Sequence, residues 1–220
     1  MKIKTLLFLL ISTTTLTFAQ KLKKVSLSRN IGCTTSKEVF YVLEDNPEIR
    51  QGNYKQTTPM FDVNGQYENG FRSGVWEYST RQGIVQRYDF TNHKVLLTPP
   101  DPGQIKSWIV DDQGNAVKEL NEFPMYLGGP GRFYSYLGRC SRFPAEATRA
   151  RKDGAVRIFV IINKQGKMVN PVVMNNPGYG YAEAALQALS MVPDEWIPYE
   201  VDGKPVDVRL EIKVNFAIGR

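Results

Sequence analysis

The sequence predicts an α+β protein in two domains, the second with two helices on one face of an antiparallel sheet. Three observations predict this class. Short strands with glycine turns fill the first half of the chain, a proline-rich break follows at residues 98–103, and strands then alternate with helices. The last segment, Val206 to Phe216, alternates apolar and polar residues with period two, which indicates a strand with one buried face.

Residues 1–19 have the features of a signal peptide. Lys2 and Lys4 precede an apolar stretch, and Thr17-Phe18-Ala19 has the small-x-small spacing of a cleavage site. We expect a mature chain that begins at Gln20, is periplasmic or secreted, and has no transmembrane anchor. A retained N-terminal anchor is the alternative.

Residues 20–97 are expected to form a small all-β domain. Asn-Gly and other x-Gly turns separate alternating strands, which predicts antiparallel hairpins. One side of this sheet is expected to carry Tyr67, Trp76 and Tyr78. The glycine and aromatic spacing from Gly65 to Tyr78 resembles the MORN repeat and its bacterial antitoxin-like relatives. A repeat array needs several units to bury its faces, so we expect this unit to pack on something else.

Residues 98–122 are expected to link the domains. Pro99, Pro100 and Pro102 cannot continue a sheet. A short hairpin, Ser107 to Val110 and Ala116 to Leu120, is expected to lead into the second domain at residues 123–220.

The second domain is expected to follow a definite order of elements. Pro144 suits the first turn of a helix, because its missing N–H costs nothing there. Asn163 to Gly166 predicts a hairpin turn, and an alanine-rich apolar stripe predicts a later helix. The expected elements are a short helical piece at 132–137, a helix from 144 to 154, strands at 155–162 and 167–174, a helix at 181–191, and the strand at 206–216.

This order resembles the C-terminal domain of the TonB energy-transducer family. The resemblance rests on several short pieces of sequence, in the family's order over about 95 residues. Phe143-Pro144 stands where the family usually has Tyr-Pro, so a ring is kept and a hydroxyl is lost. The matching pieces are Phe123-Pro124, Gly128-Gly129, Phe143-Pro144-x-x-Ala147, Gly154 to Asn163 with Gly166, Ala184-Ala185-Leu186, Trp196-x-Pro198 and Gly203-Lys204-Pro205-Val206.

The resemblance implies a non-catalytic periplasmic protein-interaction module. Domains of this type bind a short segment of an outer-membrane receptor as an added strand, linked to TonB-dependent transport across the membrane. The matching edge here is expected at the last strand, with partner-binding residues Val206, Val208, Leu210, Ile212, Val214 and Phe216. A working transducer has an uncleaved N-terminal membrane helix and a long proline-rich spacer. We expect neither here, and so expect binding without direct energy transduction.

The net charge is unevenly distributed along the mature chain, and its excess of +4 lies in residues 123–220. Residues 20–122 hold thirteen basic and thirteen acidic residues, whereas residues 123–220 hold thirteen basic and nine acidic. The densest part of this positive excess is a possible anion patch formed by Arg139, Arg142, Arg149, Arg151 and Lys152. A cell-envelope binder of anionic glycan or lipid is therefore an alternative function, and a secreted structural or inhibitor-like protein with a covered strand edge is another. The basic runs lack the interleaved aromatics of a nucleic-acid platform.

Two cysteines, Cys33 and Cys140, are expected in an oxidising compartment. They form either one bridge between the N-terminal segment and the C-terminal domain or two buried thiols, and their spacing does not decide between these.

No catalytic or cofactor-binding pattern stands out, so we expect no enzyme, cofactor or metal. His93 is the only histidine, and there is no P-loop or nucleophile elbow. Asp194 and Glu195 are interpreted as solvated loop charges, because adjacent loop residues rarely converge on one substrate atom.

Overall fold

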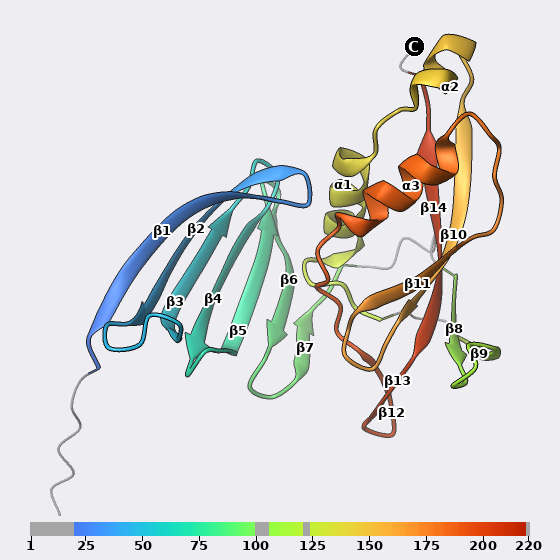
Figure 1. Ribbon diagram of the computed structural model, residues 1–220. Helices are drawn as coiled ribbons and strands as arrows, with labels where there is room; N and C mark the ends of the chain where they lie inside the picture. Colours follow the sequence, from blue (N-terminus) through green and yellow to red (C-terminus); the bar gives the residue numbers. More distant parts are fainter. Residues whose placement is uncertain (1–19, 100–105, 121–123, 219–220) are drawn as a thin grey trace, which may run out of the picture.

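The computed structural model describes residues 20–99, 106–120 and 124–218. The predicted signal peptide, residues 1–19, and most of the proline-rich break lie outside the described residues. The described chain forms two β-rich bodies that lie side by side, with helices α1 (Gly129–Cys140) and α3 (Tyr181–Ser190) between them (Figure 1).

The N-terminal body is a seven-stranded antiparallel sheet in which each strand pairs with the next. Asn69 and Gly70, at the turn between the fourth and fifth strands, both have positive φ, as a type I′ hairpin turn requires. The strands are β1 (Leu22–Ile31), β2 (Thr34–Leu43), β3 (Arg50–Thr57), β4 (Asp62–Glu68), β5 (Phe71–Thr80), β6 (Gly83–Asp89) and β7 (Lys94–Leu97).

Aromatic side chains fill one face of this sheet. Trp76 is fully buried, and Tyr67 packs edge-to-face on it with ring centroids 5.3 Å apart. Tyr78 is buried two residues farther along the same strand, so the three rings expected on one side of the sheet share this face. Tyr54 stacks on Trp76 from the other side, and this cluster is the core of the N-terminal body.

The C-terminal body has a five-stranded antiparallel sheet in the order β11-β10-β14-β8-β9, with a separate two-stranded hairpin β12-β13. The strands are β8 (Lys106–Val110), β9 (Ala116–Leu120), β10 (Gly154–Ile162), β11 (Met168–Val173), β12 (Tyr199–Val201), β13 (Lys204–Val206) and β14 (Val208–Phe216), and the remaining helix is α2 (Ala145–Ala150). An α+β class is therefore confirmed for this part of the chain.

The described C-terminal body contains three helices, where the sequence predicted two helices and a short helical piece at residues 132–137. That piece is part of a full helix, α1, which extends beyond it at both ends. Its apolar residues Phe133, Tyr136, Leu137 and Cys140 recur at the spacing of a helix face and are all buried. The helix begins with Gly129-Pro130-Gly131, residues that are more typical of a turn, so the sequence analysis placed its start too late. Pro130 is nevertheless well tolerated in the first turn of a helix.

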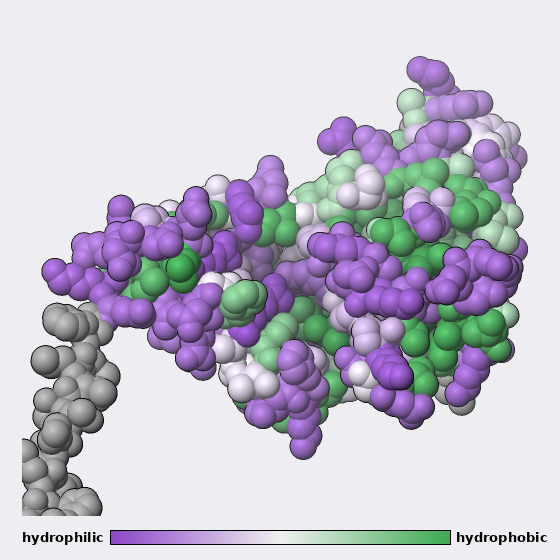
Figure 2. Space-filling model, turned by 60° about the horizontal axis from the view of Figure 1, so that its bottom comes forward, coloured by the Kyte–Doolittle hydropathy of each residue, from purple (hydrophilic) through white to green (hydrophobic). Residues whose placement is uncertain are grey.

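The hairpin β8–β9 extends the C-terminal sheet. The sequence placed it between the domains, but β8 pairs with residues Val208 to Glu211 of β14. Strand β14 consequently lies between β10 and β8 and is the central strand of its sheet. On the molecular face seen in Figure 2, hydrophobic side chains gather on this body, whereas the N-terminal body is largely hydrophilic.

Candidate functional site

The predicted sheet edge at residues 206–216 is only partly an edge, and this corrects the sequence-based expectation. Val206 belongs to β13, where it pairs with Tyr199 of β12. Residues Val208 to Glu211 are covered by β8, whose pairing starts at Lys106. From Ile212 to Phe216, β14 has β10 on one side and no strand of the described chain on the other.

The direction of the main-chain groups along this open stretch follows from the neighbouring pairs. The C=O of Asp207 accepts a hydrogen bond from the N–H of Val110, with 3.1 Å between nitrogen and oxygen. Main-chain groups of successive strand residues alternate between the two sides. The N–H and C=O groups of Lys213 and Asn215 therefore point away from β10, toward the open side.

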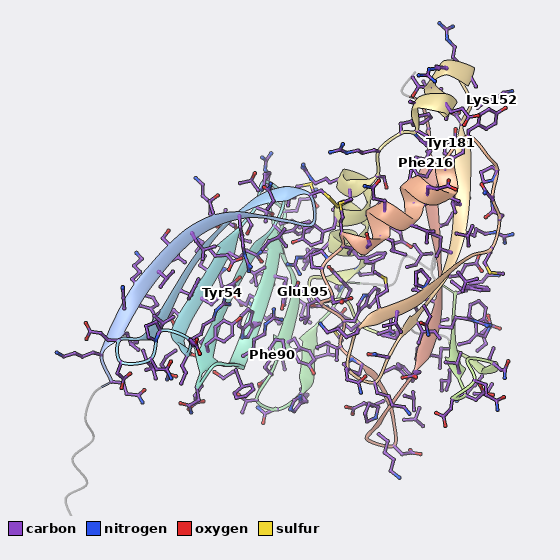
Figure 3. The ribbon with its side chains drawn as sticks, viewed as in Figure 1. Tyr54, Phe90, Lys152, Tyr181, Glu195 and Phe216 are labelled. Carbon is purple, nitrogen blue, oxygen red and sulfur yellow. A yellow bond between two sulfur atoms is a disulfide. The ribbon has the colours of Figure 1, made fainter. Side chains whose placement is uncertain are left out.

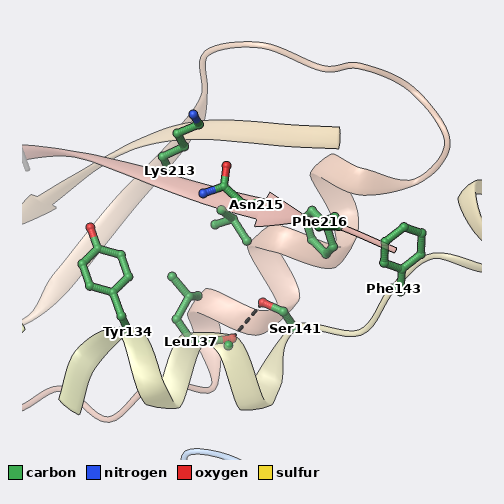
Figure 4. A pocket seen from close by; sticks show the side chains of 10 residues that line it. Tyr134, Leu137, Ser141, Phe143, Lys213, Asn215 and Phe216 are labelled. Atoms are coloured by element: carbon green, nitrogen blue, oxygen red, sulfur yellow. Dashed lines mark hydrogen bonds between the residues drawn. The ribbon is translucent and has the colours of Figure 1, made fainter. Parts of the chain in front are cut away.

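A groove follows the open stretch of β14 and has helix α1 as its other wall (Figure 4). Its volume is about 610 Å³. We call it the α1–β14 groove. It is lined by Tyr134, Leu137, Gly138, Ser141, Phe143 and residues 213–217.

The helix wall offers an apolar surface with few free polar groups. Tyr134 and Leu137 lie on the side of α1 that faces β14, and Phe143 closes the end beside Phe216. The hydroxyl of Ser141 donates to the carbonyl of Leu137 over 2.8 Å, so it is already engaged. An extended peptide in this groove would meet main-chain donors and acceptors on one side and apolar side chains on the other.

The side chains proposed from the sequence to bind a partner form the domain core. Five of them are at most 4% exposed and pack between the sheet and the helices, namely Val208, Leu210, Ile212, Val214 and Phe216. Only Val214 and Phe216 line the groove. The alternating pattern reports which face of a strand is buried, and it carries no information about whether the strand has a neighbour in the sheet plane.

The groove contains residues that the sequence analysis did not propose, above all Tyr134, Leu137, Lys213 and Asn215. The helical spacing of the apolar residues in α1 was the available signal for the first two. The sequence analysis interpreted the polar residues of β14 only as its solvent-exposed face. Their main-chain N–H and C=O groups are the ones that point toward the open side of the strand.

The predicted anion patch is divided by the structure. Arg139 lies at the end of α1, where its Nε donates to the sulfur of Met60 in the N-terminal body over 3.4 Å. The remaining members, Arg142, Arg149, Arg151 and Lys152, are exposed on or near α2. Their placement keeps them accessible but does not gather all five into one site.

Cys33 and Cys140 are joined by a disulfide, with their Cα atoms 5.2 Å apart. The bridge connects the turn between β1 and β2 to the last residue of α1, and Figure 3 shows it where the two bodies meet. Of the two alternatives left open by the sequence, the structure contains the bridge.

A partly buried ion cluster holds the two bodies together beside α1. Arg132 of α1 is 1% exposed, and its guanidinium forms an ion pair with Glu195. Arg72 of β5 donates to the same carboxylate over 3.2 Å. Burial alone would raise the pKa of Glu195, but the two guanidinium charges outweigh it and hold that pKa below its usual value. The interpretation of Glu195 as a solvated loop charge was therefore wrong (Figure 3).

Hydrogen bonds to the main chain complete this contact. The amide of Gln86 donates to the carbonyl of Tyr126 over 3.2 Å and accepts from the N–H of Gly128 over 2.6 Å. Arg132 also donates to the carbonyl of Leu127 over 2.9 Å. Since α1 starts immediately after these residues, one wall of the groove is attached to the N-terminal body at both of its ends.

Comparison with protein families finds a match for the segment that contains β14. Residues 140–218 match the family model for the Gram-negative bacterial TonB protein C-terminal domain. The matched segment runs from the last residue of α1 through β14, which is less than half of the chain. It indicates a periplasmic protein-interaction role of the TonB type. No curated protein and no solved structure matches the chain.

The TonB-type match leaves out β8, β9 and nearly all of α1, and it does not extend to residues 20–97. The likeness of that segment to MORN repeats stays a prediction. Within residues 20–99, 106–120 and 124–218, no helix is both long and apolar enough to cross a membrane. The same residues contain no cluster of three His, Cys, Asp or Glu side chains suited to a metal ion.

Proposed function

We propose that this protein is a non-catalytic periplasmic interaction module that binds an extended segment of a partner protein by strand addition in the α1–β14 groove. The observation that carries the proposal is the open stretch of β14, because Lys213 and Asn215 turn their main-chain groups toward a groove with an apolar opposite wall. Main-chain hydrogen bonds supply affinity in this binding mode, and the pockets beside the strand supply selectivity.

The partner is a segment of an outer-membrane receptor or transport component. The TonB-type match of residues 140–218 supports this choice of partner. A purely structural role would suit a β14 that is covered along its whole length, but β8 covers only Val208 to Glu211. The added strand is therefore short, and it lies opposite Ile212 to Phe216.

The test is a binding measurement with peptides from the N-terminal segments of outer-membrane receptors, read by fluorescence anisotropy. The key variant is Lys213→Pro. Proline removes the N–H that faces the groove and places its ring in the path of the added strand, while edge positions tolerate proline because no ladder bond is lost. We expect peptide affinity to fall about tenfold or more, since both a main-chain bond and the space for it are lost.

Lys213→Ala is the matched control, because it removes the side chain and keeps the main chain. We expect it to bind the same peptide within about threefold of the unmodified protein. Circular dichroism on both variants shows whether the sheet is intact. If the proline variant is folded and binds as well as the alanine variant, strand addition at this edge is ruled out.

A further inference from the structure

A second cavity lies where the two bodies meet, away from the α1–β14 groove. Its volume is about 490 Å³, which falls within the ~300–1,000 Å³ typical of small-molecule sites. The turn between β3 and β4, the turn between β5 and β6, and one side of α1 form its walls. Sites between domains are common places for ligands, because neither domain alone has to supply the whole concave surface.

Two arginines from different bodies line this cavity. Arg81 comes from the turn between β5 and β6, and Arg139 comes from the last turn of α1. No carboxylate lines the cavity, and no acidic group of the described chain lies within 4.0 Å of either guanidinium. Two like charges in one concavity repel each other, and an anion placed between them removes that repulsion.

The remaining walls suit an anionic group attached to a larger body. Thr80 and Ser135 are the hydroxyl-bearing residues of the lining, with the Thr80 hydroxyl accepting from the N–H of Gln82 over 3.2 Å, while Met60 and Phe61 give the cavity an apolar floor. Arg139 rests on that floor through its Nε, which donates to the sulfur of Met60. Its two terminal nitrogens make no hydrogen bond to the described chain that would compete with a ligand.

The walls are also fixed relative to each other before any ligand binds. Arg139 immediately precedes Cys140, whose disulfide to Cys33 ties the end of α1 to the N-terminal body. A site whose walls are already joined loses less entropy on binding than one that must assemble them.

We propose that this cavity, the Arg81–Arg139 pocket, binds the phosphate group of a phosphorylated sugar or a lipid headgroup. A phosphate offers three terminal oxygens and so can meet both guanidinium forks, whereas a carboxylate has only two oxygens to share. The apolar floor then contacts the body that carries the phosphate. This site is separate from the strand-binding groove and does not depend on it.

The test uses the full mature chain and calorimetric titration with inorganic phosphate and with glucose 1-phosphate. A third arm measures co-sedimentation with phosphatidylcholine vesicles that contain either phosphatidic acid or phosphatidylserine. The variants are Arg81→Gln and Arg139→Gln, with Arg149→Gln as the matched control, because Arg149 is an exposed arginine on α2 outside the pocket. We expect each pocket variant to weaken binding about tenfold and the control to change it less than twofold.

The outcomes separate the two sources of phosphate. Binding of glucose 1-phosphate identifies a soluble ligand, and binding of phosphatidic acid vesicles without phosphatidylserine vesicles identifies a lipid headgroup. The proposal is overturned if no phosphate-bearing probe binds, or if Arg149→Gln weakens binding as much as Arg139→Gln. Receptor peptide binding should be unchanged in both pocket variants, so failure here is distinguishable from failure of strand addition.

Discussion

Removing the Cys33–Cys140 bridge tests how much of the stability of this protein comes from joining its two bodies. The change is a double substitution, Cys33→Ala with Cys140→Ala. Alanine is chosen because Cys140 is 4% exposed, and a serine hydroxyl there would be buried. The matched control is the unmodified protein with its bridge reduced, which loses the covalent link and keeps both sulfur atoms.

The expected magnitude follows from the length of chain that the bridge closes. The two cysteines are 107 positions apart. In the chain-entropy description, closing a loop of that length restricts the unfolded chain enough to contribute about 4.8 kcal/mol to the free energy of unfolding at 25 °C. The alanine variant also leaves a small void beside α1, which costs about 1 kcal/mol more. The reduced protein is therefore expected to lose about 5 kcal/mol and the double variant about 6 kcal/mol.

Urea unfolding followed by circular dichroism measures the total loss. Hydrogen exchange read by mass spectrometry then assigns it, since peptides from β1–β7 and from β10–β14 report on the two bodies separately. If the two bodies unfold as one unit, both sets of peptides lose protection together when the bridge is reduced. A loss below about 2 kcal/mol in the reduced protein would show that the ends of the loop stay close in the unfolded chain, which refutes the entropy reasoning.

Two further predictions concern buried contacts. In Glu195→Gln, the free energy of unfolding should lose part of its dependence on pH. In the unmodified protein the folded-state pKa of Glu195 is lowered, because Arg132 and Arg72 outweigh the effect of burial. The stabilisation from the ionised Glu195 is therefore complete above the unfolded pKa of about 4.3 and is lost as pH falls through the folded value. Thermal unfolding from pH 3 to 6 measures this, and an unchanged acid slope would contradict it. In Gly65→Ala, the added Cβ would overlap the indole of Trp76. We expect the free energy of unfolding, measured in urea, to fall by about 1–3 kcal/mol. An unchanged value would mean that the ring can move aside.

The elements of the C-terminal body were largely predictable because their signals are local. Asn163 to Gly166 forms the expected turn, and the strand pair around that turn lies close to its predicted bounds. The helix after Pro144 begins as expected but ends at Ala150, and Gly154, which was expected to stop it, is the first residue of β10. The order of these elements was enough to indicate the TonB-type domain that the family model then matched. Each of these features depends on residues within a few positions of one another.

The site was less predictable because it depends on contacts between distant segments. The pairing of Trp108 with Arg209 places β8 beside β14, and the guanidinium of Arg209 lies over the rings of Trp108 and Phe159. Nothing near Arg209 in the sequence signals that neighbour. Glu195 is a similar case, since its cationic partners are 63 and 123 positions away and its burial exists only once the two bodies meet.

The central position of β14 also affects how this protein reaches its native state. The N-terminal sheet is built from strands that pair with their immediate successors, so its contacts are local and it can form quickly. The C-terminal sheet has to bring β8 and β14 together across about 100 residues, so that sheet cannot be completed before β14 is available. We therefore expect an early intermediate with a formed N-terminal sheet and a β8–β9 hairpin in which the edge of β8 that pairs with β14 is open. In that intermediate the apolar face of α1 has no strand to cover it, which makes it the species most exposed to aggregation and to chaperones during folding.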